Sequence, residues 1–192
     1  MVYFTMKKNE IRKILKNKRL NLSKNEILTK SKQIKNRLFQ MDEFKKAKNI
    51  LFYVSYDNEV FTHDAIKEAL IDKIIVVPIS NIKDNSLIFS RLNSFKDLEE
   101  GAYGILEPKK DLIKEITIDK IDLIIVPGIG FDLRGNRIGH GKGFYDRFLK
   151  NTNALILALA FEFQIIEKIP IEEHDKPVDI IITEKRIINC KN

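Results

Sequence analysis

The chain has 192 residues, of which 44% are hydrophobic and 32% are charged, with a single cysteine and no tryptophan. This composition excludes a disordered chain, a disulfide framework and a cysteine-based metal site, and no apolar run reaches the roughly 18 residues of a membrane helix. We expect one soluble, cytoplasmic domain over residues 1–192, without a membrane partner.

The net charge of +7 is concentrated near the N-terminus. Residues 1–49 contain 15 basic and 4 acidic side chains, whereas the rest of the chain contains 19 and 23. Such an asymmetry indicates an anionic ligand, for which nucleic acid, an acidic membrane surface, nucleotide phosphates and polycarboxylates all qualify. A solvated helix surface explains the charge equally well. Few aromatic side chains lie among the basic ones, which disfavours nucleic acid.

Two basic helices are predicted over residues 7–40, packed on the rest of the domain. Hydrophobic side chains recur at helical spacing through residues 7–22, and basic side chains form a second stripe beside them. This stripe consists of Lys8, Arg12, Lys16 and Arg19. We expect its cations at the rim of whatever surface the helix covers. Ser23 and Glu26 form a capping box, which predicts that a second helix begins there.

Short apolar runs with strand character follow, and helices alternate with them. The runs are Asn49–Val54, Ile74–Pro78, Ser86–Leu92, Asp122–Pro127, Ala154–Phe161 and Asp179–Thr183. The third run is predicted at a sheet edge, and the sixth is predicted to be the last strand. Thr62 can cap a helix to about Leu70, and another is expected over Gly143–Asn151. This pattern indicates an α/β fold: a single three-layer domain with a largely parallel sheet, helices on both faces and an N-terminal helical pair.

Six of the eight glycines lie between Gly128 and Gly143, directly after a predicted strand and before a predicted helix. Ligands of parallel α/β proteins bind where such loops leave the carboxyl ends of strands, and glycine lets backbone N–H groups approach a phosphate. The spacing fits neither the dinucleotide-binding motif nor the Walker A motif. Glycine stands at every second position from Gly139 to Gly143, and Arg137 and Lys142 add positive charge. This combination predicts an anion site. Asp146, just behind, is of the type that holds Mg²⁺.

A structural explanation stays open for part of this segment. A tight hairpin at Arg134–Arg137, followed by a glycine bend, would account for Gly135. It would not account for the alternating glycines with a lysine between them.

Five segments resemble, in the same order, the 5-formyltetrahydrofolate cyclo-ligase family, also known as the 5,10-methenyltetrahydrofolate synthetases. They are Lys8–Ser23, Phe52–Val60, Gly104–Pro108, Val126–Leu149 and Ile169–Glu184. The glycine-rich fourth segment is the most specific of them. The resemblance extends over nearly the whole chain, and five motifs in order carry more weight than any one of them.

The resemblance implies roles for individual residues. ATP would be bound by Lys8, Arg12, Arg137, Ile138, Gly139, His140, Gly141, Lys142, Gly143, Phe144 and Tyr145. The reduced folate would contact Val54 and Glu59, and Mg²⁺ would be held by Asp146 and Asp175. Lys142, Tyr145 and Glu59 would be the catalytic residues.

Two positions depart from the family's pattern. Phe144 stands where family members commonly have a tyrosine, which removes a hydroxyl group but keeps a ring for stacking. His140 lies where the family varies, and we expect it to serve the loop rather than the chemistry.

The implied reaction is the ATP- and Mg²⁺-dependent cyclisation of 5-formyltetrahydrofolate to 5,10-methenyltetrahydrofolate, with release of ADP and phosphate, through a phosphorylated formyl intermediate. ATP would be a co-substrate, Mg²⁺ the cofactor and the reduced folate the other partner. The enzyme would be a monomer or weak homodimer that binds no nucleic acid.

Two rival functions come from other classes. A sugar-phosphate isomerase shares the order of strand, glycine loop and helix, but it would need a general base close to the loop and would use no ATP. A nucleic-acid binder would use the basic helices, and it would leave the glycine cluster unexplained.

Overall fold

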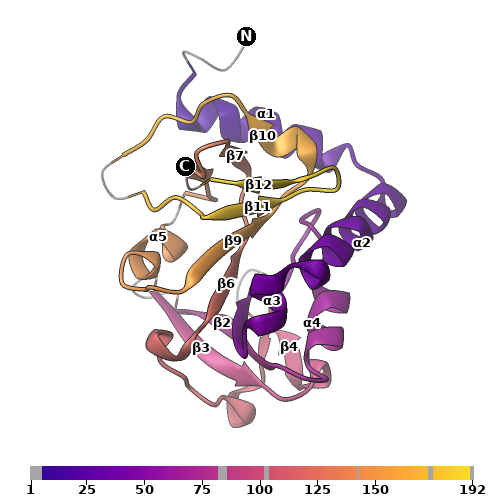
Figure 1. The fold of residues 1–192 in the computed structure, drawn as a ribbon, viewed down its shortest axis with the longest axis vertical. Helices are drawn as coiled ribbons and strands as arrows, with labels where there is room; N and C mark the ends of the chain where they lie inside the picture. Colours follow the sequence, from indigo (N-terminus) through magenta and orange to yellow (C-terminus); the bar gives the residue numbers. More distant parts are fainter. Residues whose placement is uncertain (1–5, 82–85, 102–103, 142, 173–174, 191–192) are drawn as a thin grey trace.

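The computed structural model describes residues 6–81, 86–101, 104–141, 143–172 and 175–190 (Figure 1). Its α-helices are α1 (Lys8–Leu20), α2 (Lys24–Gln40), α3 (Asp42–Lys46), α4 (His63–Ala69) and α5 (Phe144–Leu149). Its central sheet contains β1 (Asn49–Phe52), β2 (Ile74–Asn81), β3 (Ser86–Leu92), β6 (Leu123–Val126), β9 (Leu155–Leu159), β11 (Ile180–Ile182) and β12 (Ile187–Asn189). Shorter strands are β4 (Leu98–Glu100), β5 (Leu106–Pro108), β7 (Gly130–Asp132), β8 (Arg137–Ile138) and β10 (Ile165–Ile166). Single 3-10 turns are η1 (Phe95–Asp97), η3 (Lys110–Leu112), η4 (Ile118–Lys120) and η5 (Glu162–Gln164).

The central sheet is mostly parallel, as predicted. Its order is β12-β11-β9-β6-β1-β2-β3, in which the inner strands run parallel, while β12 and the predicted edge strand β3 pair antiparallel with their neighbours. The chain passes from β1 to β2 on one side and later places β6 on the other side of β1. The carboxyl ends of β1 and β6 therefore form the crevice in which ligands of such sheets bind.

The prediction that residues 179–183 form the last strand is wrong. β11 is followed by β12, and Ile181 lies opposite Ile188 in the antiparallel pair. A tight turn reverses the chain, in which the Lys185 and Arg186 N–H groups donate to the Thr183 hydroxyl. The side chains of β12 are exposed or half-buried, so this strand lacks the apolar run that marked the others.

Helices lie on both faces of the central sheet (Figure 1). Successive residues of a strand point to opposite faces. Ile50 and Phe52 of β1 belong to the core beneath α2, α3 and α4, whereas Leu51 belongs to the core that includes Leu149 of α5. Because the strands are buried on both faces, their sequences are continuously apolar, and this allowed their positions to be predicted from the sequence. Across the described ranges, no helix combines the length and the apolar character needed to cross a bilayer.

The two N-terminal helices cover different surfaces. Ile11 and Leu15 of α1 belong to a separate core with the small sheet of β10, β7 and β8, whereas Leu38 of α2 packs on the central sheet. The predicted capping box is confirmed: Ser23 N donates to Glu26 Oε2 at 2.9 Å, and Glu26 N donates to Ser23 Oγ at 3.3 Å.

Part of the glycine-rich segment is a hairpin, as the structural explanation predicted. β7 and β8 pair antiparallel, and Gly135 in the turn between them has a φ of 83°. A Cβ atom at this position would lie 2.1 Å from the Val178 carbonyl oxygen, so glycine is required. The alternating glycines lie beyond the hairpin, on the way to α5.

Candidate active site

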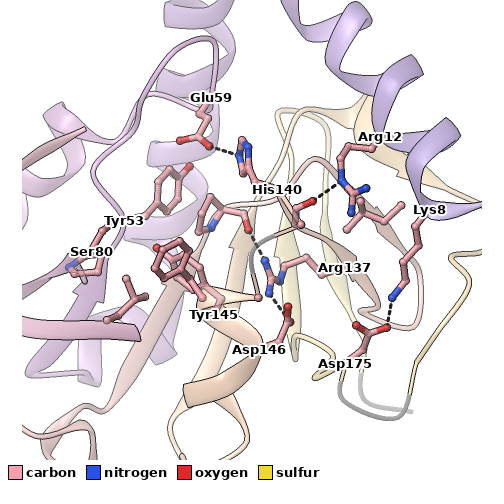
Figure 2. A pocket seen from close by; sticks show the side chains of 18 of the residues that line it. Lys8, Arg12, Tyr53, Glu59, Ser80, Arg137, His140, Tyr145, Asp146 and Asp175 are labelled. Atoms are coloured by element: carbon pink, nitrogen blue, oxygen red, sulfur yellow. Dashed lines mark hydrogen bonds and ion pairs between the residues drawn. The ribbon is translucent and has the colours of Figure 1, made fainter. Parts of the chain in front are cut away.

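A cavity of about 950 Å³ lies at the carboxyl ends of β1, β2 and β6 (Figure 2). Tyr53 and Val54 follow β1, Ser80 lies near the end of β2, and Pro127 follows β6. The rest of the wall comes from α1, the loop between β1 and α4, β3, β5, the glycine-rich segment and the segment after β10. A volume of this size is typical of a small-molecule site.

The cavity brings together every described residue that was predicted to bind ATP, folate or Mg²⁺. They are Lys8, Arg12, Val54, Glu59, Arg137, Ile138, Gly139, His140, Gly141, Gly143, Phe144, Tyr145, Asp146 and Asp175. Lys142 lies outside the described residues. These side chains come from segments far apart in the sequence, so the fold rather than one motif assembles them.

Lys8 and Arg12 reach the cavity from one face of α1, because residues four apart in a helix lie one above the other. The Arg12 Nε donates to the Gly139 carbonyl oxygen at 2.9 Å, which joins α1 to the glycine-rich loop. The Lys8 Nζ lies 2.6 Å from Asp175 Oδ2. Of the basic stripe predicted to lie at a rim, Lys8 and Arg12 therefore line the cavity, whereas Lys16 and Arg19 are not among its lining residues.

Arg137 of β8 supplies a buried positive charge in the glycine-rich segment, since only 7% of its surface is exposed. Its Nη2 lies 2.6 Å from Asp146 Oδ1, and its guanidinium carbon lies 5.5 Å from the centre of the Tyr145 ring. Gly141 and Gly143 have φ values of 102° and 69°, which side-chain-bearing residues rarely adopt. Gly139, Gly141 and Gly143 therefore expose their backbone to the cavity.

Asp146 and Asp175 are each paired with a cation rather than gathered in a metal cage. In the part of the chain that the structure describes, no group of three or more His, Cys, Asp or Glu side chains is arranged to hold a metal ion. Mg²⁺ commonly uses one or two carboxylates together with water and substrate phosphates. The two carboxylates thus fit an Mg²⁺ ion that binds together with a nucleotide.

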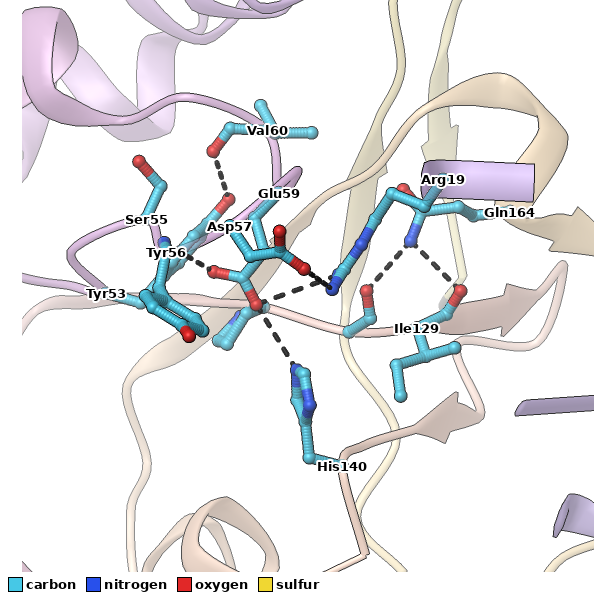
Figure 3. Close-up of polar contacts among 12 residues, drawn as sticks. Arg19, Tyr53, Ser55, Tyr56, Asp57, Glu59, Val60, Ile129, His140 and Gln164 are labelled. Atoms are coloured by element: carbon cyan, nitrogen blue, oxygen red, sulfur yellow. Dashed lines mark hydrogen bonds and ion pairs between the residues drawn. The ribbon is translucent and has the colours of Figure 1, made fainter. Parts of the chain in front are cut away.

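Glu59 projects from the loop between β1 and α4, and its side chain is 10% exposed. Its Oε2 accepts a hydrogen bond from Tyr56 N at 3.1 Å, and its Oε1 lies 3.3 Å from His140 Nε2 and 3.8 Å from Arg19 Nη1 (Figure 3). Three parts of the chain therefore hold this carboxylate: its own loop, α1 and the glycine-rich loop.

The loop that carries Glu59 is fixed by hydroxyl groups. Thr62 Oγ1 donates to the Tyr53 carbonyl oxygen and accepts from Ser55 N, both at 2.9 Å, and the Tyr53 hydroxyl donates to the Val60 carbonyl oxygen at 3.0 Å. Thr62 does precede α4, but its side chain makes no capping hydrogen bond. The prediction of a threonine cap is therefore wrong in its chemistry, because the hydroxyl is used by the loop.

Burial raises the pKa of the Tyr145 hydroxyl, and the negative charge of Glu59 raises it further, while Arg137 acts in the opposite direction. Burial and Glu59 also raise the pKa of the Tyr53 hydroxyl. Both groups therefore stay protonated near neutral pH. Tyr145 can donate a hydrogen bond but cannot act as a general base.

The part of the wall that β2, β3 and β5 form was not predicted from the sequence. Its residues include Pro78, Ser80, Leu87, Ile105 and Glu107. Glu107 lies within a segment that resembles the family, but nothing around it in the sequence indicates a site. Tyr53 and Tyr56 were also missed, although their position just after a buried strand was an available signal.

The chain is similar to known proteins over almost its whole length. A model of the 5-formyltetrahydrofolate cyclo-ligase family matches residues 4–184. A 5-formyltetrahydrofolate cyclo-ligase of Mus musculus is 32% identical over 189 residues, covering 92% of this chain and 93% of that protein. The corresponding protein of Haemophilus influenzae is 29% identical and covers 93% of this chain and 98% of its own.

Two solved structures are also similar. The structure of Aquifex aeolicus 5,10-methenyltetrahydrofolate synthetase has a TM-score of 0.87 and 36% identity, covering 97% of this chain and 94% of that chain. A 5,10-methenyltetrahydrofolate synthetase from Mycoplasma pneumoniae has a TM-score of 0.76 and 25% identity, covering 93% of this chain and 99% of that chain.

Proposed function

The chain belongs to the 5-formyltetrahydrofolate cyclo-ligase family and is a ligase of folate metabolism, and we propose that it converts 5-formyltetrahydrofolate to 5,10-methenyltetrahydrofolate with ATP and Mg²⁺, releasing ADP and phosphate. One observation carries the proposal. A single cavity joins a cationic end, built by α1 and the glycine-rich loop, to a wall of aromatic, apolar and carboxylate side chains. Such a cavity can hold a nucleotide and a folate next to each other.

The chemistry explains why both substrates must meet. A formamide carbon is a poor electrophile, because the nitrogen lone pair delocalises into the carbonyl group. Transfer of the γ-phosphoryl group from ATP to the formyl oxygen turns that oxygen into a leaving group and releases ADP. Nitrogen 10 of the same folate then attacks the carbon at the high effective concentration of an intramolecular step. As the ring closes, the carbon–oxygen bond breaks, and the phosphate departs with the proton that nitrogen 10 loses.

The cationic end supports binding of the triphosphate. Lys8, Arg12 and Arg137 point to the cavity, and the glycine-rich loop adds backbone N–H groups and Lys142. Asp146 and Asp175 would hold Mg²⁺, which neutralises phosphate charge when it is bound. Each carboxylate is already paired with a cation, Asp146 with Arg137 and Asp175 with Lys8. When MgATP binds, the carboxylates can turn to the metal ion and the cations to the phosphates, so that every charge stays paired.

The opposite end supports binding of the folate. Val54 offers an apolar surface after β1, and Glu59 of the following loop adds a carboxylate to the same cavity. The protonated Tyr145 hydroxyl can donate a hydrogen bond to the formyl oxygen or its phosphate. Glu59 can accept a hydrogen bond from the N–H group of nitrogen 10 and orient that nitrogen for attack. The chain's tasks are therefore to position two substrates and to neutralise charge.

The methenyl chromophore provides a direct test. We expect the protein to generate its absorbance from 5-formyltetrahydrofolate only when ATP and Mg²⁺ are both present, with one ADP formed for each product. Reactions that lack ATP, lack Mg²⁺ or contain a non-hydrolysable ATP analogue are the controls. Product formation without ATP consumption, or no product at all, would contradict the proposal.

A further inference from the structure

Glu107 is a carboxylate of the cavity wall that none of the roles above uses. It lies in β5, is 9% exposed, and accepts a hydrogen bond at Oε1 from Ser80 N of β2 at 2.8 Å. Unlike Glu59, Asp146 and Asp175, it forms no ion pair with any described residue. A buried carboxylate without a cation is costly unless both of its oxygens find donors.

Gly101 keeps the second carboxylate oxygen of Glu107 clear. A Cβ atom at this glycine would lie 2.5 Å from Oε2 and 2.9 Å from Cδ of Glu107. The φ angle of Gly101 is not positive, so the space that glycine leaves is what matters here, and not its backbone freedom. Within the described chain Oε2 accepts no hydrogen bond, which leaves an acceptor for a ligand.

The wall around Glu107 is mostly apolar. It is lined by Pro78, Leu87 and Ile105. Figure 2 shows Ser80, which donates to Glu107, across Tyr145 from the cations of α1. The cavity therefore has a cationic end that suits phosphates, and away from it an apolar wall with one anionic acceptor.

We propose that Glu107 binds the amino-pyrimidinone edge of the folate's pteridine ring and thereby helps to select a reduced folate. That edge carries an exocyclic amino group and a ring N–H side by side, and both are donors. A carboxylate only accepts hydrogen bonds, and its bonds from such donors are stronger than neutral ones. The apolar wall would contact the flat ring, and the negative charge of Glu107 repels a triphosphate from this end. The inference rests on the proposed function, since it names the part of that substrate that Glu107 holds.

Glu107→Gln tests this with almost no change of shape. The amide keeps one oxygen for the Ser80 N–H group but presents an NH2 group to the pteridine donors. We expect calorimetry without ATP to show at least tenfold weaker binding of 5-formyltetrahydrofolate. The KM for the folate should rise by a similar factor, and the KM for ATP should not change. Glu99→Gln is the matched control, because Glu99 is the exposed Cα partner of Glu107 in the β4–β5 pair.

A substrate analogue identifies the contact itself. A folate with a methyl group in place of the exocyclic amino group should bind the unmodified protein several-fold more weakly. It should lose little further affinity in Glu107→Gln, because both changes remove the same interaction. Gly101→Ala gives an independent variant, since its Cβ displaces the carboxylate, and it should also weaken folate binding.

Unchanged folate affinity in Glu107→Gln and Gly101→Ala would overturn the inference. A raised KM for ATP with an unchanged KM for folate would also overturn it, because the carboxylate would then serve the nucleotide base. The binding measurement needs no turnover. It therefore decides on Glu107 even if the unmodified protein forms no product, an outcome that would contradict only the proposed reaction.

Discussion

Two carboxylates of the cavity each share an ion pair with a cation that we assign to phosphate binding. Asp146 pairs with Arg137 and Asp175 pairs with Lys8, both at 2.6 Å. These pairs keep each side chain oriented toward the cavity without burying an uncompensated charge. Substitutions that remove one of these charges should therefore weaken Mg²⁺ or nucleotide binding more than they destabilise the fold.

Asp146→Asn keeps the shape of the side chain and removes its charge. We expect the half-saturating Mg²⁺ concentration for product formation to rise about tenfold or more, because an amide is a weaker ligand than a carboxylate. Initial rates across an Mg²⁺ titration measure this. Asp119→Asn, at an exposed position, is the control. The same Mg²⁺ dependence in both variants would remove Asp146 from the ligands.

Lys142→Ala tests an assignment that rests on the sequence, since Lys142 lies outside the described residues. The loss of a point charge against phosphate should reduce turnover more than tenfold, with an unaltered far-UV circular dichroism spectrum. Lys150→Ala, an exposed position after α5, should keep full activity. A rate equal to that of the unmodified enzyme would exclude Lys142 from the chemistry.

Tyr145→Phe separates the hydroxyl group from the ring that lies beside Arg137. We expect turnover to fall about tenfold, because one hydrogen bond to the reacting group is lost. Since the pKa of this hydroxyl is raised above its ordinary value of 10, Tyr145 stays protonated below that pH. The two pH–rate profiles should therefore be parallel from pH 6 to 9. Full activity would leave the ring with a packing role alone.

At the scale of elements, α1 determines where the loop between β1 and α4 lies. Arg19 of α1 is 5% exposed, and its guanidinium lies 3.6 Å from Asp57 Oδ2 and 3.8 Å from Glu59 Oε1. Its carbonyl oxygen accepts a hydrogen bond from the Asn58 side chain at 3.2 Å. Asp57 itself has a φ of 54°, an uncommon conformation for a residue with a side chain. A buried cation thus holds a strained, acidic loop at the end of the cavity where we propose that the folate binds.

Arg19→Met should release this loop while keeping a long side chain in α1. We expect the free energy of unfolding to fall by about 2 kcal/mol and the KM for folate to rise several-fold. Chemical denaturation and substrate titrations measure the two effects. Lys13→Met, an exposed position on the same helix, is the control. If stability and the folate KM both stay at their original values, Arg19 does not hold the loop.

The elements that could be predicted are those long enough to show a pattern. Every predicted strand overlaps an observed one, and the capping box located the start of α2 from four residues. β5, β7, β8 and β10 have only two or three residues each, too few for an alternating pattern. Their pairing depends on distant contacts, such as Ile165 of β10 opposite Phe131 of β7.

At the scale of the whole molecule, the cavity depends on the folding of all its segments. The residues alone pointed to the glycine-rich loop, and the helical pattern placed Lys8 and Arg12 at a rim without naming a ligand. Glu59 and Asp175 were recognised only through the family resemblance. A lone charged residue on a helix or loop carries no pattern of its own. Glu107 was missed for the same reason, since its environment comes from strands that the sequence does not bring together.

Ligand-dependent stability tests the cavity as a unit. MgATP at a hundred times its dissociation constant should stabilise the folded state by about 2.7 kcal/mol, which corresponds to a rise in melting temperature of about 5–10 °C. AMP at the same concentration should give a smaller rise, because the cationic end would bind the outer phosphates. Differential scanning fluorimetry measures both shifts. Equal shifts with AMP and MgATP would contradict a triphosphate site.

The contact between His140 and Glu59 belongs to both sides of the cavity, since one residue comes from the glycine-rich loop and the other from the loop after β1. A nucleotide that moves His140 would change the surroundings of Glu59, which we propose to contact the folate. Thermodynamic linkage makes this effect reciprocal: the factor by which ATP changes the dissociation constant of the folate equals the factor by which the folate changes that of ATP. The order in which the two substrates enter can therefore alter the speed of loading, but not the stability of the ternary complex.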